Sequence, residues 1–152
     1  MASPNQTPVT GAEHAPAGEP FAALVGFYRA FNGRDLALME QNWDAGEGVS
    51  MDNPLGGIRR GWTEIQTVYE CIFGARASVR VEFHDYTLHH IGDVFLAVGP
   101  ERGRLERPGV VLDLAIRTSR VFRRAGSAWR QFHHHDSIES PELLAAYRDA
   151  VR

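Results

Sequence analysis

The sequence predicts a single α+β domain in which helices pack on the concave face of a curved antiparallel sheet. Apolar residues recur three and four positions apart in the first half of the chain, as on one face of a helix. In the second half the pattern changes to alternation between apolar and polar residues, which is typical of strands. With 152 residues, of which 43% are hydrophobic and 23% charged, the chain is long enough for one domain with its own core.

The first half predicts three helices and one short strand. A helical hairpin is expected over 21–43, with Pro20 in its first turn and Asp35 as the N-cap of its second helix. A short strand is expected over 49–55, and a third helix follows Gly61. This order places helices before the main run of strands, which favours an α+β arrangement.

The second half predicts four antiparallel strands and a final helix. The strands are expected over 79–91, 94–98, 110–124 and 129–138. The segment 99–109 contains glycine, proline and five charges, so we expect it to be an exposed connection. Ser140 can cap the last helix, with a proline at its first position.

The N-terminal segment differs in composition from the rest of the chain. Residues 1–19 are rich in alanine, proline, glycine, serine and threonine, and they lack the charged and apolar regions of a signal peptide. We therefore expect a disordered tail over 1–19 and a folded domain over 20–152. No apolar run approaches the roughly 18–20 residues of a membrane span, and the single Cys71 suits a reducing compartment, so a cytoplasmic location is expected.

Charge and composition exclude several functions. The formal net charge of −3 gives no positive field for nucleic acid or a membrane surface, so neither is expected as a partner. All sixteen basic residues are arginine. Without lysine there can be no Schiff-base catalysis and no phosphate-binding loop that uses a lysine, so no cofactor is expected.

Four motifs follow one another along the chain: Asn32 and Asp35 in the hairpin, the corner 52–56, the segment 61–65, and strands that end at Trp129. Taken in this order, they resemble the nuclear-transport-factor-2-like superfamily, to which ketosteroid isomerases and SnoaL-like polyketide cyclases belong. The resemblance covers nearly all of 21–152. It implies a SnoaL-like domain with a cone-shaped fold, a pocket for a small molecule between helices and sheet, and a homodimer.

A local resemblance links two strands to the association domain of calcium/calmodulin-dependent protein kinases. It lies in 118–124 and 129–137, where the spacing from Arg120 to Trp129 agrees without a gap. The resemblance implies that Arg120 lines the pocket and binds small carboxylates. Where that family can carry a second basic ligand, this chain has Asp136.

Alternation along these strands indicates which side chains meet. Arg120 shares a face with the apolar residues of its strand and is expected to point inward. If Phe132 marks the inner face of the last strand, His134 and Asp136 point inward as well. Our hypothesis is that Arg120 pairs with Asp136 and that His134 performs acid–base catalysis. The alternative is a structural ion pair between adjacent strands.

The resemblance to ketosteroid isomerases also implies ligand contacts at the corner 52–56 and on the first helix. Asn53 stands where these enzymes carry their general-base aspartate, and an amide can orient a ligand oxygen but cannot take a proton. Asp52 is expected on the opposite face of the strand, as a ligand contact or as a turn residue. Tyr28 lies near the position of the oxyanion-stabilising tyrosine; its alternative is a core residue.

The remaining histidines of the last strand allow three interpretations. His133 and His135 share the face opposite His134, so these two could chelate a metal together with a third ligand such as His84 or His90. They could equally lie at a dimer interface or on a half-exposed sheet face. No metal-ligand motif is present, and no metal is expected.

Two functions therefore remain open from the sequence. The first is binding of a small organic molecule in the pocket, with an isomerase, cyclase or dehydratase step as the candidate reaction. Whether the chain is an enzyme stays open at this point. The second is a non-catalytic module for self-association, which the local kinase-domain resemblance implies.

Overall fold

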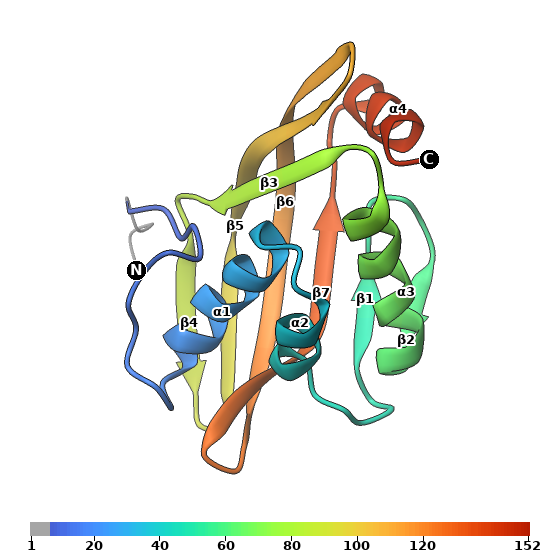
Figure 1. Ribbon diagram of the computed structural model, residues 1–152. Helices are drawn as coiled ribbons and strands as arrows, with labels where there is room; N and C mark the ends of the chain where they lie inside the picture. Colours follow the sequence, from blue (N-terminus) through green and yellow to red (C-terminus); the bar gives the residue numbers. More distant parts are fainter. Residues whose placement is uncertain (1–6) are drawn as a thin grey trace.

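A curved, mostly antiparallel sheet forms the frame of the protein in the computed structural model, which describes residues 7–152 (Figure 1). Its order is β2-β1-β7-β6-β5-β3, with β4 also paired to β5; β1 runs parallel to β7 and every other pair is antiparallel. The seven strands are β1 (Ser50–Asp52), β2 (Ile58–Arg60), β3 (Ser78–Phe83), β4 (Thr87–Ile91), β5 (Val94–Arg107), β6 (Val110–Ala125) and β7 (Ala128–Ser137). The expected α+β class is confirmed.

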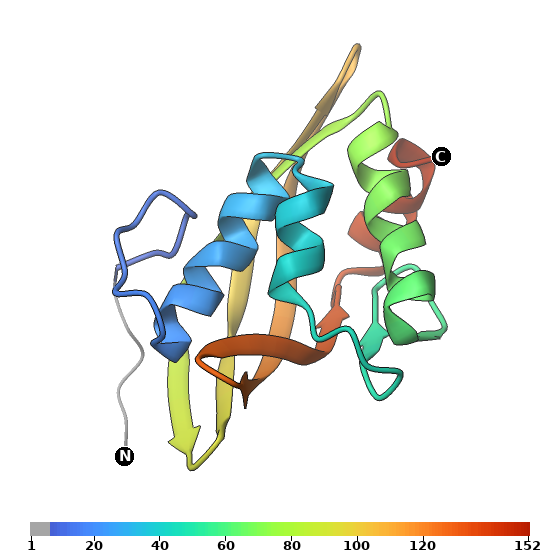
Figure 2. The same ribbon diagram turned by 60° about the horizontal axis from the view of Figure 1, so that its bottom comes forward.

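Four helices accompany the sheet in the described part of the chain: α1 (Pro20–Asn32), α2 (Leu36–Asn42), α3 (Gly61–Gly74) and α4 (Pro141–Ala150). Figure 2 shows α1, α2 and α3 side by side on one face. The helix ends follow the sequence as predicted. Pro20 occupies the first turn of α1, the Asp35 carboxylate accepts from the Leu38 amide at 3.0 Å, and Ser140 Oγ accepts from the Leu143 amide at 3.1 Å. No helix among residues 7–152 is long and apolar enough to cross a membrane.

The segment 99–109 is not the exposed connection that the sequence predicted. Strand β5 continues through it to Arg107 and pairs residue by residue with β6. Inward and outward side chains alternate along this part of the strand. Glu101 and Leu105 point inward, and the exposed residues are Arg102, Arg104 and Glu106. Only one apolar side chain, that of Leu105, marks the inner face here, so the strand pattern was hidden.

The prediction of a disordered tail over 1–19 is wrong for residues 7–19, which are ordered. Residues 1–6 lie outside the described part of the chain. Val9 is fully buried and pairs with Phe83 through two backbone hydrogen bonds of 2.9 and 3.0 Å. Arg29 Nε donates to the Gly11 carbonyl oxygen at 2.8 Å. This segment therefore adds to the sheet edge and covers α1.

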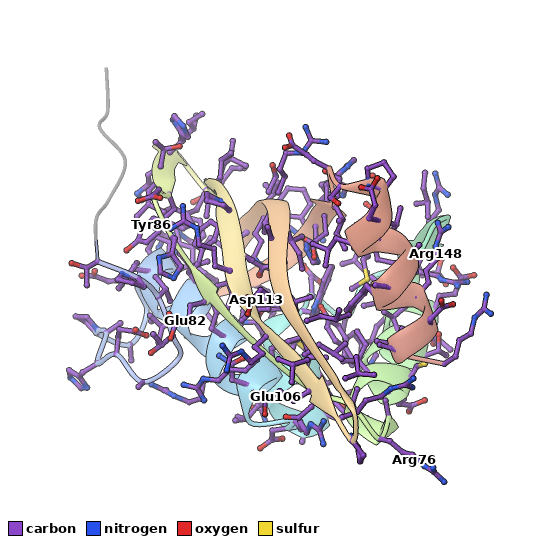
Figure 3. The ribbon with its side chains drawn as sticks, turned by 90° about the horizontal axis from the view of Figure 1, so that it is seen from above. Arg76, Glu82, Tyr86, Glu106, Asp113 and Arg148 are labelled. Atoms are coloured by element: carbon purple, nitrogen blue, oxygen red, sulfur yellow. The ribbon has the colours of Figure 1, made fainter. Side chains whose placement is uncertain are left out.

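Strands β3 and β5 approach closely at Gly103. A Cβ atom at this glycine would lie 1.9 Å from the Arg80 carbonyl oxygen and 2.8 Å from Val81 Cα. The outer side of β5 and β6 is charged and carries Glu106 and Asp113 (Figure 3). Arg104 lies 3.5 Å from the Glu106 carboxylate and 3.4 Å from the Asp113 carboxylate. The glycine is needed for the close contact on the inner side, not for a turn.

We expect Gly103→Ala to lower the free energy of unfolding by about 1–3 kcal/mol, because the added methyl group meets backbone atoms that cannot move aside. Gly74→Ala is the matched control, since nothing lies within 4 Å of a Cβ atom there, and its effect should stay within about 0.5 kcal/mol. Urea unfolding of the three proteins measures both. Equal stability of the Gly103 and Gly74 variants would contradict the close approach of β3 and β5.

Candidate functional site

A β-bulge in β7 decides which side chains of that strand face the interior. Val121 of β6 pairs with His133, whereas the next residue, Phe122, pairs with Gln131, so Phe132 is the extra residue. Gln131 and His134 are therefore both buried, while Phe132 is half-buried and lies under the guanidinium of Arg123. The prediction that His134 and Asp136 point inward is confirmed, but the inner residue before the bulge is Gln131, not Phe132.

A narrow pocket lies between the sheet and the helices, with a cavity volume of about 50 Å³. Its walls are mostly apolar side chains: Phe27, Phe31, Met51, Pro54, Leu55, Val68, Ile72, Val79, Val81 and Ile116. The polar lining residues are Asn53, Tyr69, Glu101, Arg120, His134, Asp136 and Tyr147. The cavity thus suits a largely apolar molecule that carries a few polar groups.

Arg120 is buried and forms an ion pair with Glu101, a partner that the sequence did not predict. Its Nη2 donates to Glu101 Oε2 at 2.9 Å and its Nη1 donates to Gln131 Oε1 at 3.0 Å. Its guanidinium carbon lies 3.4 Å from the centre of the Phe27 ring. The predicted direct pair between Arg120 and Asp136 is wrong, because Glu101 on the neighbouring strand β5 occupies the guanidinium.

Two carboxyl groups, that of the buried Glu101 and that of the half-buried Asp136, are joined by one hydroxyl. Thr118 Oγ1 lies 3.0 Å from Glu101 Oε1 and 2.8 Å from Asp136 Oδ1. A threonine hydroxyl has a single proton and can donate to only one acceptor at a time. The Thr118 hydroxyl therefore donates to Glu101 or to Asp136 and links β5, β6 and β7 at the polar end of the pocket.

Asp136 also contacts the ring of His134. Nε2 of His134 is in ion-pair contact with Asp136 Oδ1, and neither ring nitrogen has a partner with full hydrogen-bond geometry among the described residues. Burial and the charge of Arg120 lower the pKa of His134 below its usual 6.5. Burial alone would raise the pKa of Asp136, but His134, Arg120 and the Thr118 hydrogen bond together lower it.

These shifts favour a neutral imidazole beside an ionised carboxylate at neutral pH. In that state the ring proton belongs on Nε2, where the carboxylate accepts it. Nδ1 of His134 then keeps a free lone pair. The arrangement is that of a base held in one tautomer by Asp136.

Tyr69 of α3 is a second polar group of the pocket wall. Its hydroxyl oxygen accepts from Trp43 Nε1 at 3.2 Å, and no acceptor for the hydroxyl proton lies among residues 7–152. Burial raises the pKa of Tyr69 above its usual range, so the hydroxyl stays protonated. It can therefore donate a hydrogen bond to a ligand oxygen.

The structure separates the other predicted ligand residues. Asn53 lines the pocket, and its Oδ1 accepts from the Leu55 amide at 2.8 Å. Tyr28 does not line the pocket, because its buried hydroxyl donates to Glu101 Oε2 at 2.7 Å. Asp52 lies on the outer face of the sheet, where its carboxylate is 3.1 Å from His135 Nδ1. Tyr28 is thus the core residue of its alternative interpretation, and Asp52 lies on the strand face opposite the pocket, as expected.

Sequence reasoning missed Glu101, Thr118, Gln131 and Tyr69. Glu101 lies in the segment 99–109, which was expected to be an exposed connection, and Gln131 is turned inward by the bulge, which the sequence does not mark. Tyr69 is spaced like the apolar residues of its helix, so its spacing does not distinguish it from a core residue. Thr118 alone carried a usable signal, since it shares its strand face with Arg120.

The sequence signature of the SnoaL-like domain matches residues 22–141. A comparison with curated proteins finds no match. Many solved structures are similar to the chain, and three of them follow. The first is a protein from Thiobacillus denitrificans, provisionally named a calcium/calmodulin-dependent protein kinase type II association domain, with 24% identity and a TM-score of 0.70 over 84% of this chain and 100% of that chain.

The second is a provisionally named dehydratase of the NTF2-like family from Streptomyces avermitilis, with 23% identity and a TM-score of 0.71 over 80% of this chain and 94% of that chain. The third is a ketosteroid isomerase-like protein from Erwinia carotovora atroseptica, with 19% identity and a TM-score of 0.66 over 80% of this chain and 94% of that chain. At these identities the likeness establishes the fold, and the expected cone-shaped architecture is confirmed.

Arg120→Met should lower the free energy of unfolding by about 3–5 kcal/mol, because it leaves Glu101 buried without its cation. Glu101→Gln added to that variant should restore part of the lost free energy of unfolding, since it removes the unpaired buried charge. Urea unfolding of the wild type, both single variants and the double variant gives the coupling between the two side chains. Additive losses would contradict a direct buried ion pair.

The lowered pKa of His134 also predicts how stability depends on pH. Below about pH 6.5 the unfolded chain takes up a proton at this residue and the folded protein does not, so stability falls as the pH falls toward the folded pKa. His134→Gln should flatten the decline in the free energy of unfolding between pH 7 and 5. The exposed His89→Gln serves as control and should leave it unchanged. A pH dependence of His134→Gln identical to that of the wild type would contradict a buried, neutral imidazole.

Proposed function

This chain belongs to the SnoaL-like domain family, and we propose that its pocket is an active site for proton transfer on a small, largely apolar carbonyl compound. One observation carries the proposal. Nε2 of the buried His134 is in ion-pair contact with Asp136, without full hydrogen-bond geometry, and Nδ1 has neither an ion-pair nor a hydrogen-bond partner among residues 7–152. A positioned base without a protein acceptor or donor is suited to a substrate proton.

In the proposed reaction His134 Nδ1 takes a proton from the carbon atom next to the substrate carbonyl. Asp136 stabilises the imidazolium that forms, because its ionised carboxylate lies against the opposite ring nitrogen. The Tyr69 hydroxyl donates a hydrogen bond to the oxygen on which negative charge develops. His134 then returns its proton.

The end product depends on where the proton returns. Return to a different carbon atom isomerises the compound, whereas delivery to a hydroxyl group two carbons from the carbonyl releases water. Both steps need the same base and the same oxygen contact. The structural likeness to proteins named as a dehydratase and as ketosteroid isomerase-like supports this reaction class.

The base in this proposal lies on a different element from the one that the isomerase resemblance implied. That resemblance placed the base position at residue 53, where this chain has asparagine. The Asn53 side chain is engaged with the Leu55 amide and serves the turn after β1. Proton transfer is therefore assigned to His134 on β7. Arg120 has a supporting role, because its guanidinium donates hydrogen bonds to Glu101 and Gln131.

Self-association remains a second proposal, and it is compatible with a pocket. Ile91 of β4 is 72% exposed, and Val94 and Val98 of β5 are 38% and 37% exposed. Exposed apolar side chains of neighbouring strands are suited to contact with a second copy of the chain. Sedimentation of the purified protein tests the expected homodimer, and a monomer at all concentrations would contradict it.

Hydrogen exchange tests the catalytic proposal directly. The untagged protein is incubated in D₂O with steroid enones and aromatic, polyketide-like ketones, and deuterium uptake next to the carbonyl is followed by NMR. His134→Gln and Asp136→Asn should slow enzyme-dependent uptake by about 10²–10⁴-fold, the usual contribution of a positioned base. His89→Gln, on an exposed strand position, should leave the rate unchanged.

Thermal stabilisation by the same compounds separates binding from catalysis. A compound that binds the wild type but exchanges no faster than in buffer, or one that exchanges equally fast with His134→Gln, would contradict the proposed reaction.

A further inference from the structure

The outer face of the sheet brings three metal-ligating side chains together where β1 meets β7. In the parallel register of these strands Ser50 lies opposite His133, and Asp52 lies opposite His135. Alternate residues of a strand share one face, so all four side chains project to the side away from His134. The two histidines that the bulge turns outward thus meet a carboxylate from a segment more than eighty positions earlier in the chain.

The distances suit a common ligand. One ligand atom from each of Asp52, His133 and His135 lies within 4.8 Å of the other two. Asp52 Oδ2 is 3.1 Å from His135 Nδ1. Asp52 and His133 are half-buried and His135 is exposed, so the cluster is reachable from solvent.

Ser50 gives the cluster a supporting contact of the kind that metal sites use. Its Oγ lies 2.8 Å from His133 Nδ1. A hydrogen bond at one ring nitrogen fixes the orientation and the tautomer of the ring and leaves the other nitrogen available as a ligand. His133 can therefore present Nε2 without losing its contact with β1.

We propose that Asp52, His133 and His135 form a binding site for a divalent transition-metal ion of the zinc type. Two imidazoles and one carboxylate are the donors that such ions accept, whereas Mg²⁺ and Ca²⁺ require mainly oxygen ligands. Three protein ligands leave a coordination position open to water or to a ligand from solution. The third ligand is Asp52, not the His84 or His90 considered from the sequence.

Charges around the site act in both directions. Asp52 supplies the negative charge of the ligand set, and Glu47 lines the adjoining hollow. Arg60 of β2, which pairs with Ser50 of β1, lines the same hollow, and its positive charge repels a cation. One carboxylate ligand beside one arginine predicts a reversible site of moderate affinity.

Metal binding would also affect the sheet itself. Strand β1 joins β7 through only three paired positions, and β2 is attached to the sheet through β1 alone. An ion that links Asp52 to His133 and His135 ties this edge to the long strands. Since binding to the folded chain alone stabilises it, the melting temperature should rise with the concentration of the ion.

The test uses the untagged, EDTA-treated chain and two probes, Zn²⁺ by calorimetry and Co²⁺ by its visible absorption. We expect one saturable site per chain, a rise in melting temperature with Zn²⁺, and a Co²⁺ spectrum typical of nitrogen and oxygen ligands. His135→Gln and Asp52→Asn should abolish all three signals, and Ser50→Ala should weaken binding by about 10-fold or more.

His89→Gln is the matched control, because it removes an exposed strand histidine outside the cluster and should leave binding unchanged. Melting temperatures without metal show that each variant is folded. Absence of saturable binding to the wild type, or equal binding by His135→Gln and the wild type, would overturn the proposal. The outcome does not depend on the reaction proposed for the pocket, since His134 faces the opposite side of the sheet.

Discussion

The buried charge of Arg120 is the constraint around which the interior is organised. A guanidinium that is 1% exposed must be neutralised and hydrogen-bonded inside the fold, because leaving water costs several kcal/mol per ion. Glu101 provides the negative charge, Gln131 a second acceptor and Phe27 a ring face. These partners come from β5, β7 and α1. The guanidinium of Arg120 therefore also fixes how the sheet and the first helix pack together. The polar end of the pocket follows from this requirement.

The bulge at Phe132 gives β7 two separate tasks. Before the bulge the strand supplies Gln131 to the buried arginine, and after it His134 and Asp136 reach the pocket. The alternate residues His133 and His135 turn outward to meet Asp52. Three consecutive histidines therefore serve opposite faces of one sheet, and the inner one is protected from solvent while the outer pair is accessible.

The sequence predicts what depends on local patterns and misses what depends on partners far along the chain. The caps at Asp35 and Ser140 and the inward direction of Arg120 follow from spacing and alternation, and the structure agrees. Glu101 was missed because its stretch of β5 has one apolar inward residue and looks like a polar loop. The bulge leaves no mark in the alternation of β7, and without Glu101 the nearest available partner for Arg120 was Asp136. Electrostatic pairing across strands is decided by register, which composition does not encode.

The central claim is that the fold holds His134, a residue of the pocket wall, as a neutral base whose Nδ1 has no partner among the described residues. Nitrogen NMR of the histidine rings in labelled protein tests this most directly, since protonated and unprotonated ring nitrogens have well-separated chemical shifts. At pH 7 we predict a neutral His134 ring with the proton on Nε2, next to Asp136, and an unprotonated Nδ1. A ring protonated on both nitrogens at pH 7, or a neutral ring with its proton on Nδ1, would contradict the account.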